Sequence, residues 1–329
     1  MLKTGELQIL QLRLSSGIVL PQVTVAYELE GPSGHENTVV ALGGISAKKN
    51  VTTWWKNLFG PGKIIDPLAH RILSFDFLGG HGETKITGHT DSHPVVSTQD
   101  QAQILLQLLD HLQISKVSHF IGASYGGMVG QAFAEKNPQR INQLVVISAA
   151  HCSSPHSVAF RVLQRKIISS FLEIGQAEKG ISLARSLAMI TYRTPEEFNQ
   201  RFNNTPTDPE DVDSFPAWNY LKARGDHYAQ TMSAKAYLCL SHSIDQHQVD
   251  VRKITAPTLV VAVKQDQLVP WSLCETMTQQ LAGPKQFVCI ESIYGHDAFL
   301  KEEVLFTQIL NDHLIKPNVP KGTVTPAGL

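Results

Sequence analysis

The stretch Gly122-Ala123-Ser124-Tyr125-Gly126 places a serine on a tight turn between two glycines. Residues 117–121 before it form a short apolar run typical of a buried strand. Residues 128–136 after it have the apolar spacing of a helix, which ends before Asn137-Pro138. Such a turn exposes the serine hydroxyl, and the helix N-terminus favours a developing negative charge beside it. The pattern predicts Ser124 as a nucleophile; the alternative is a tight turn with no chemical role.

Short apolar runs recur along the chain and alternate with helical patterns. The predicted strands are residues 19–28, 38–42, 71–75, 117–121, 144–147, 258–263 and 286–290, and a helix is predicted at 98–112. Nearly continuous apolar strands alternating with helices favour an α/β fold with a mostly parallel sheet covered on both faces.

The alternation of strands and helices stops between residues 151 and 250. Helical patterns follow one another there at 160–172, 180–190 and 217–240. We therefore expect a core formed by residues 1–150 and 251–315, with residues 151–250 inserted as a helical lid. Residues 316–329 contain three prolines and two glycines, and we expect this tail to be disordered.

The composition excludes several classes of function. A net charge of −1 over 329 residues gives no reason to expect a nucleic-acid partner. The four cysteines are scattered without a C-x-x-C pair, which favours a reducing cytoplasm over a disulfide framework or a zinc site. The N-terminus has no apolar signal core, and no segment reaches the roughly 18 apolar residues of a membrane helix. We expect a cytoplasmic protein with no membrane segment, no metal and no bound cofactor.

Two further acid–base residues follow predicted strands. Asp266 comes shortly after the strand at 258–263, and His296 comes shortly after the strand at 286–290. Functional groups in such sheets gather at the carboxyl ends of the strands. A serine needs an imidazole to accept its proton, and the imidazole needs a carboxylate to fix its tautomer. The order serine, aspartate, histidine is that of the α/β-hydrolase fold, although a helix-capping Asp266 and a packing His296 are the alternatives.

The same fold places an oxyanion hole beside the nucleophile. One donor is the backbone N–H of the residue after the serine, here Tyr125. The second donor comes from the loop after an earlier strand, where Gly43-Gly44-Ile45-Ser46 follows residues 38–42. We select the backbone N–H of Ile45 for this role.

With these residues in place, the chain resembles the homoserine O-acyltransferases of the α/β-hydrolase superfamily over roughly residues 17–314. The motifs that carry the resemblance are Trp54-Trp55, Gly60-Pro61-Gly62-Lys63, Leu78-Gly79-Gly80, Gly126-Gly127-Met128, Thr191-Tyr192-Arg193 and Gly295-His296-Asp297-Ala298-Phe299-Leu300. The resemblance implies an acyltransferase of methionine biosynthesis that uses acyl-CoA as a co-substrate and a small amino acid as acceptor. By the same resemblance Ser124, Asp266 and His296 form the catalytic triad.

The family holds its amino-acid acceptor with an arginine and a tyrosine seven residues apart, which Arg185 and Tyr192 match here. Asp297 would then bind the substrate ammonium, and a guanidinium suits the substrate carboxylate. A solvated helix charge is the alternative for Arg185, and Arg193 is the alternative contact.

Several residues differ from the commoner acetyltransferase pattern and look similar to the succinyl-using branch. They are Ala123 and Tyr125 around the serine, the loop at 43–46, and Arg224. Arg224 would pair with the free succinyl carboxylate, and the Tyr125 hydroxyl would add a donor, so succinyl-CoA is favoured over acetyl-CoA. Acetyl-CoA as donor, L-serine as acceptor, and a plain esterase or thioesterase remain open, as does a homodimeric state.

Overall fold

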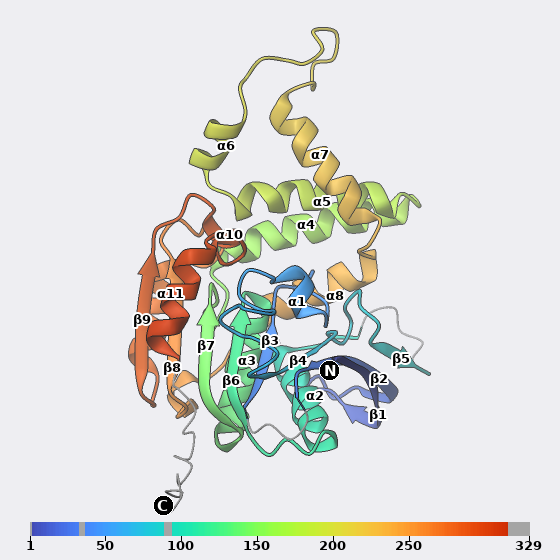
Figure 1. Ribbon diagram of the computed structural model, residues 1–329. Helices are drawn as coiled ribbons and strands as arrows, with labels where there is room; N and C mark the ends of the chain where they lie inside the picture. The colour runs from blue at the N-terminus through green and yellow to red at the C-terminus, as the bar shows by residue number, and fades with distance from the viewer. Residues whose placement is uncertain (1, 33–36, 89–93, 315–329) are drawn as a thin grey trace, which may run out of the picture.

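The strands form one mixed sheet in the computed structural model, which describes residues 2–32, 37–88 and 94–314 (Figure 1). The strands are β1 Leu2–Arg13, β2 Val19–Glu30, β3 Thr38–Leu42, β4 Arg71–Phe75, β5 Lys85–Thr87, β6 Val117–Ala123, β7 Ile141–Ile147, β8 Thr258–Val263 and β9 Lys285–Ile290. All seven predicted strands are present, whereas β1 and β5 are additional. The tail at 316–329, for which we expect disorder, lies outside the described residues.

The sheet has the order β1-β2-β4-β3-β6-β7-β8-β9 among the described strands, and β5 pairs with β2. β2 pairs antiparallel with β1, β4 and β5. The pairings β4–β3, β3–β6, β6–β7, β7–β8 and β8–β9 are all parallel. The predicted mostly parallel α/β sheet is therefore confirmed. Its parallel part brings the carboxyl ends of β3, β6, β8 and β9 to one edge.

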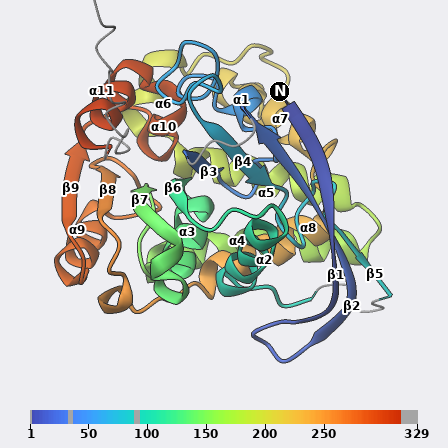
Figure 2. The ribbon, with the colours of Figure 1, turned by 60° about the horizontal axis from the view of Figure 1, so that its bottom comes forward.

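Helices cover both faces of the sheet. They are α1 Val51–Trp54, α2 Thr98–His111, α3 Tyr125–Lys136, α9 Trp271–Gln280, α10 Ala298–Lys301 and α11 Glu303–His313. Successive strand residues enter different cores: Val40 and Phe120 pack in the core that contains α2, α3 and α9, whereas Val39 and Ile121 pack in the core that contains α1, α10 and α11. Figure 2 shows α2 and α3 on one side of the sheet and α1 and α11 on the other. This two-residue alternation explains why the strands read as continuous apolar runs.

Five helices lie between β7 and β8 in the chain and sit above the carboxyl edge of the sheet (Figure 1). They are α4 Pro155–Glu173, α5 Ala177–Tyr192, α6 Pro195–Arg201, α7 Pro216–Ala229 and α8 Ala234–Asp245. They have a small hydrophobic core of their own, in which Ile168, Ile181 and Tyr237 are buried. We refer to α4–α8 as the lid.

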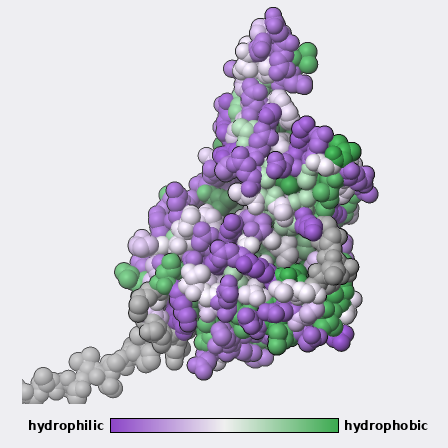
Figure 3. Space-filling model, turned by 90° about the vertical axis from the view of Figure 1, so that its right-hand side faces the viewer, coloured by the Kyte–Doolittle hydropathy of each residue, from purple (hydrophilic) through white to green (hydrophobic). Residues whose placement is uncertain are grey.

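The prediction of one helical segment over 217–240 is wrong, because the chain breaks between α7 and α8. Ser233 caps a new helix there, since its side chain accepts a hydrogen bond from the Ala236 N–H. The N-terminal end of α7 projects from the body together with α6 and residues 202–215 (Figure 1). The face of this projection seen in Figure 3 is mostly hydrophilic. No helix within the described ranges is long and apolar enough to cross a membrane.

The turn between β6 and α3 is fixed by close backbone contacts. Ser124 has φ 53° and ψ −122°, a conformation that is rare for a residue with a side chain. Its N–H donates to the Ile147 carbonyl at 2.9 Å, and the Gly126 N–H donates to the Gly43 carbonyl at 2.8 Å. A Cβ atom on Gly126 would lie 2.2 Å from the Leu42 carbonyl oxygen, so the turn can close only with glycine there.

We expect Gly126→Ala to destabilise the protein by roughly 1–3 kcal/mol, because the added methyl group must displace the backbone of β3. Gly44→Ala is the matched control, since its Cβ would have no neighbour closer than the Ser124 Oγ at 3.9 Å. Urea unfolding curves of the two variants and the wild type give the comparison. Equal stability of the two alanine variants would contradict this account of the turn.

Candidate active site

Ser124, His296 and Asp266 form one hydrogen-bonded chain at the carboxyl edge of the sheet. His296 Nε2 lies 2.9 Å from Ser124 Oγ, and His296 Nδ1 lies 2.7 Å from Asp266 Oδ2. The three residues are far apart in the sequence, but they follow β6, β8 and β9. The structure thus brings together all three residues that the sequence predicts as a catalytic set.

Asp266 is held in one orientation by the turn that follows β8. Its Oδ1 accepts hydrogen bonds from the N–H groups of Leu268 at 2.8 Å and Val269 at 3.0 Å. Its Oδ2 is left to face the imidazole of His296, so the proton of the neutral ring belongs on Nδ1. Nε2 is then free to accept the proton of Ser124.

The charges around His296 favour its protonated form. Burial lowers the pKa of this imidazole, but the Asp266 carboxylate, with a smaller contribution from Asp297, raises it more, so the net shift is upward. A ring with a raised pKa is a stronger base toward the Ser124 hydroxyl.

The two backbone N–H groups that the sequence predicts as oxyanion donors, those of Ile45 and Tyr125, lie in the loop after β3 and at the start of α3. Tyr125 is the first residue of α3, so its N–H has no acceptor within the helix. Ile45 follows Gly44, which lies beside the Ser124 hydroxyl. In the part of the chain that the structure describes, neither N–H donates a hydrogen bond to another residue. Both predicted donors are therefore available at the nucleophile.

A cavity of about 220 Å³ opens above the Ser124 hydroxyl, between the core and the lid. Its core side includes Ile45, Ser124 and His296, and its lid side includes Arg185 and Tyr192 of α5. Among the described residues, no group of histidine, cysteine and acidic side chains could hold a metal ion.

The Arg185 guanidinium lies between two tyrosine rings in this cavity. Its central carbon is 5.1 Å from the ring centre of Tyr192 and 4.6 Å from that of Tyr228. Burial lowers the pKa of Arg185, but the two phenols and Asp297 raise it more, so the guanidinium remains charged. It forms no ion pair with any carboxylate in the described residues. The structure therefore presents a cation without an ion pair among the described residues, packed against aromatic rings, in the same cavity as His296.

Asp297 also lines the cavity, but it already has a partner. The Arg193 Nε lies 2.9 Å from Asp297 Oδ2, and Arg193 Nη1 lies 2.7 Å from Glu197 Oε1. Arg193 is thus neutralised by two carboxylates, and it does not line the cavity. Of the two arginines that the sequence offers for a substrate carboxylate, only Arg185 is free to bind one.

The structure does not bring Arg224 to the cavity, contrary to the expectation that it would face a succinyl group. The orientation of α7 is set by Gly225, whose Cβ position would be 2.4 Å from the Ser182 carbonyl oxygen, together with the buried Leu221. This packing leaves Arg224 exposed, with its guanidinium 5.7 Å from the ring centre of Tyr220.

The expected role of the Tyr125 hydroxyl is also wrong. This side chain is completely buried on the core side of the turn, where its hydroxyl lies 2.7 Å from the Ser243 Oγ and its ring packs edge-on against Phe77. The Tyr125 side chain therefore does not line the cavity above Ser124. The sequence shows that an aromatic residue follows the serine but not which way its ring turns.

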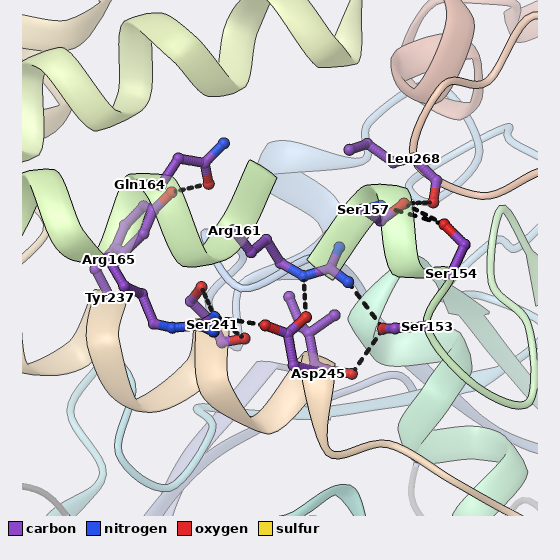
Figure 4. A network of polar contacts seen from close by, with 11 residues as sticks. Ser153, Ser154, Ser157, Arg161, Gln164, Arg165, Tyr237, Ser241, Asp245 and Leu268 are labelled. Atoms are coloured by element: carbon purple, nitrogen blue, oxygen red, sulfur yellow. Dashed lines mark hydrogen bonds and ion pairs between the residues drawn. The ribbon is translucent and has the colours of Figure 1, made fainter. Parts of the chain in front are cut away.

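One further arginine, Arg161, lines the cavity and is not among the residues predicted from the sequence. Arg161 and Arg165 of α4 both contact Asp245 of α8, at 2.5 and 2.7 Å, as Figure 4 shows. Arg161 also donates to the Ser153 hydroxyl at 2.8 Å, and it lines the cavity, whereas Arg165 does not. Two guanidinium groups share one carboxylate, so this wall carries an excess positive charge. The i, i+4 spacing of the two arginines is the only sequence signal, and it does not identify Asp245 as their partner.

Comparison with known proteins places this geometry in a family. The family described as "alpha/beta hydrolase fold" matches residues 37–303. The chain is 37% identical to a homoserine O-succinyltransferase of Xanthomonas campestris, over 85% of this chain and 76% of that protein. It is 34% identical to a homoserine O-acetyltransferase of Thermus thermophilus, over 79% of this chain and 72% of that protein.

Solved structures agree on the fold. The crystal structure of a homoserine O-acetyltransferase from Bacillus anthracis superposes with a TM-score of 0.86, covering 96% of this chain and 98% of that one at 19% identity. At that identity the likeness shows the fold alone. The sequence relatives carry the assignment further: the chain belongs to the homoserine O-acyltransferase family of the α/β-hydrolase fold.

Proposed function

We propose that this protein transfers the succinyl group of succinyl-CoA to the hydroxyl of L-homoserine through an acyl-enzyme on Ser124. The observation that carries the proposal is the Ser124–His296–Asp266 chain opening onto a cavity with an unpaired arginine, Arg185. A plain esterase has the same need for the triad but no need for a half-buried guanidinium without an ion-pair partner in the same cavity.

In the first half-reaction Ser124 Oγ attacks the thioester carbonyl carbon while His296 Nε2 takes the serine proton. The N–H groups of Ile45 and Tyr125 donate to the oxyanion of the tetrahedral intermediate. The carbon–sulfur bond then breaks, and His296 returns the proton to the departing CoA thiolate. The products are free CoA and an ester on Ser124.

In the second half-reaction the amino-acid acceptor occupies the cavity. Its hydroxyl gives its proton to His296 Nε2 and attacks the Ser124 ester, and the serine leaves as it regains the proton. The acceptor carboxylate fits the Arg185 guanidinium, which is otherwise unpaired. The acceptor ammonium fits Asp297, the single carboxylate among the described residues that line the cavity.

The donor assignment rests on the arginine pair in α4. A succinyl group brings a carboxylate into the cavity that an acetyl group lacks, and a buried carboxylate requires a cation or strong donors. Arg161 lines the cavity and belongs to a cluster of two arginines and one aspartate. One positive charge of this cluster is not neutralised by the aspartate. Arg161 therefore replaces Arg224 as the residue that would recognise succinyl-CoA.

Arg185→Ala tests the acceptor site. Loss of a charge-assisted contact costs about 1.5–3 kcal/mol, so we expect the KM for homoserine to rise roughly 10- to 100-fold. The KM for acyl-CoA should change little. Arg224→Ala, which removes an exposed arginine of α7, is the control and should leave both constants near those of the wild type. Equal damage to both half-reactions by Arg185→Ala would count against the assignment.

Arg161→Gln tests the donor. We expect kcat/KM for succinyl-CoA to fall roughly 10- to 100-fold while kcat/KM for acetyl-CoA stays within a few-fold, because only succinyl loses a partner. Arg224→Gln is the control, since Arg224 is exposed on α7 and does not line the cavity. A wild type that prefers acetyl-CoA, or an Arg161→Gln variant that loses both donors alike, would refute the succinyl assignment.

The pH dependence of acylation tests the role of His296. The imidazole must be neutral to accept the Ser124 proton, so kcat/KM for acyl-CoA should fall as the pH drops through the His296 pKa. Since Asp266 raises that pKa, the midpoint should lie above the ordinary histidine value of about 6.5. Asp266→Asn should move the midpoint to lower pH and reduce the rate. A midpoint that does not move in this variant would show that another group controls the profile.

A further inference from the structure

Arg193 occupies a buried position between two carboxylates, directly after α5. Its side chain is 8% exposed, and those of Glu197 and Asp297 are 4% and 16% exposed. One guanidinium thus joins the Glu197 Oε1 of α6, at 2.7 Å, to the Asp297 Oδ2 beside the catalytic histidine, at 2.9 Å. A cation bridging the lid and the histidine loop in this way has a geometry that lysine, with its single nitrogen, cannot reproduce in full.

The segment that carries Arg193 also contacts the loops that carry Asp266 and His296. The Arg193 carbonyl accepts a hydrogen bond from Gln267 Nε2 at 2.9 Å, and Gln267 follows Asp266. The Thr194 hydroxyl donates to the Ile293 carbonyl at 2.5 Å, just before His296. The end of α5 is therefore fixed against both loops, and this fixes the place from which Arg193 reaches Asp297.

The charges show what the bridge achieves. Without Arg193, Asp297 would lose its ion pair in a largely buried region, and Glu197 would keep only its contact with Arg201. Arg201 contacts the same Glu197 oxygen at 2.9 Å from the exposed side of α6, with no ion pair to Asp297. Among the described residues, Arg193 is therefore the cation that forms an ion pair with Asp297 and orients its carboxylate.

We propose that Arg193 is a positioning residue for the acceptor half-reaction: through its bridge from Glu197 it holds the Asp297 carboxylate in one orientation, with the remaining carboxylate oxygen free for the acceptor ammonium. This inference rests on the proposed function, because it takes homoserine as the acceptor. It assigns different tasks to two arginines eight residues apart, with Arg185 contacting the substrate and Arg193 acting through Asp297.

A double-mutant cycle tests the inference. We expect Arg193→Met to raise the KM for homoserine at least about tenfold, as for other broken buried ion pairs. In an Asp297→Asn background the same change should add less than about threefold, because residues that act as one unit are not additive. Arg201→Met is the matched control and should leave the homoserine KM near that of the wild type.

A second readout separates positioning from a general loss of structure. The burst of p-nitrophenol from p-nitrophenyl acetate reports acylation of Ser124 without any acceptor. It should stay within about threefold of the wild type in Arg193→Met, since the triad itself is intact. Arg193→Lys, which keeps the charge but not the two-sided geometry, should have a homoserine KM between those of the wild type and Arg193→Met. This variant also keeps the test valid if Arg193→Met fails to fold.

Multiplicative effects of Arg193→Met and Asp297→Asn would overturn the inference, because Arg193 would then not act through Asp297. A burst reduced as much as the transfer rate, in either Arg193 variant, would overturn it as well, since Arg193 would then support the whole site. A wild type that shows the burst but transfers nothing to homoserine would instead refute the proposed function, and this inference with it.

Discussion

The turn at Ser124 is the constraint on which the site depends. A non-glycine residue with φ 53° is held there by one hydrogen bond to β7 and by the neighbouring Gly126–Gly43 hydrogen bond to the loop after β3. The same contacts join the start of α3 to the loop after β3, which carry the two N–H groups that we predict as oxyanion donors. Strain of this kind persists only where the surrounding structure over-determines it. Here the parallel sheet does so, because three of its strands end around the serine.

The arginines of the lid differ in the way their charges are paired. Three arginines at or near the cavity have different partners. Arg193 contacts two carboxylates, Arg161 shares one carboxylate with Arg165, and Arg185 has no ion-pair partner in the part of the chain that the structure describes. A charged group that is fully paired in the empty protein organises the site, whereas one with spare charge can receive a ligand. These differences in charge pairing separate an arginine that is free to bind a ligand from arginines whose charges are already used within the protein. The amino-acid composition alone does not reveal them.

Much of this architecture could be predicted from the sequence because it depends on local signals. Continuous apolar strands gave the parallel sheet, and strand-end positions brought Ser124, Asp266 and His296 to one edge. The errors concern side-chain direction and tertiary partners. Arg224 faces solvent because the close contact at Gly225 sets the rotation of α7, and the Tyr125 ring turns into the core. The Arg161 cluster needs Asp245, 84 residues away, and no local pattern pairs residues at that distance.

The central claim is that an acyl group passes through Ser124 on its way to homoserine, and intact-protein mass spectrometry tests it most directly. Mixed with succinyl-CoA alone, the protein should gain the mass of one succinyl group, located by peptide mapping on Ser124. Addition of homoserine should remove that mass and yield the O-succinyl product, and Ser124→Ala should acquire no adduct. An adduct on a different residue, or transfer to homoserine by the alanine variant at the wild-type rate, would contradict the account.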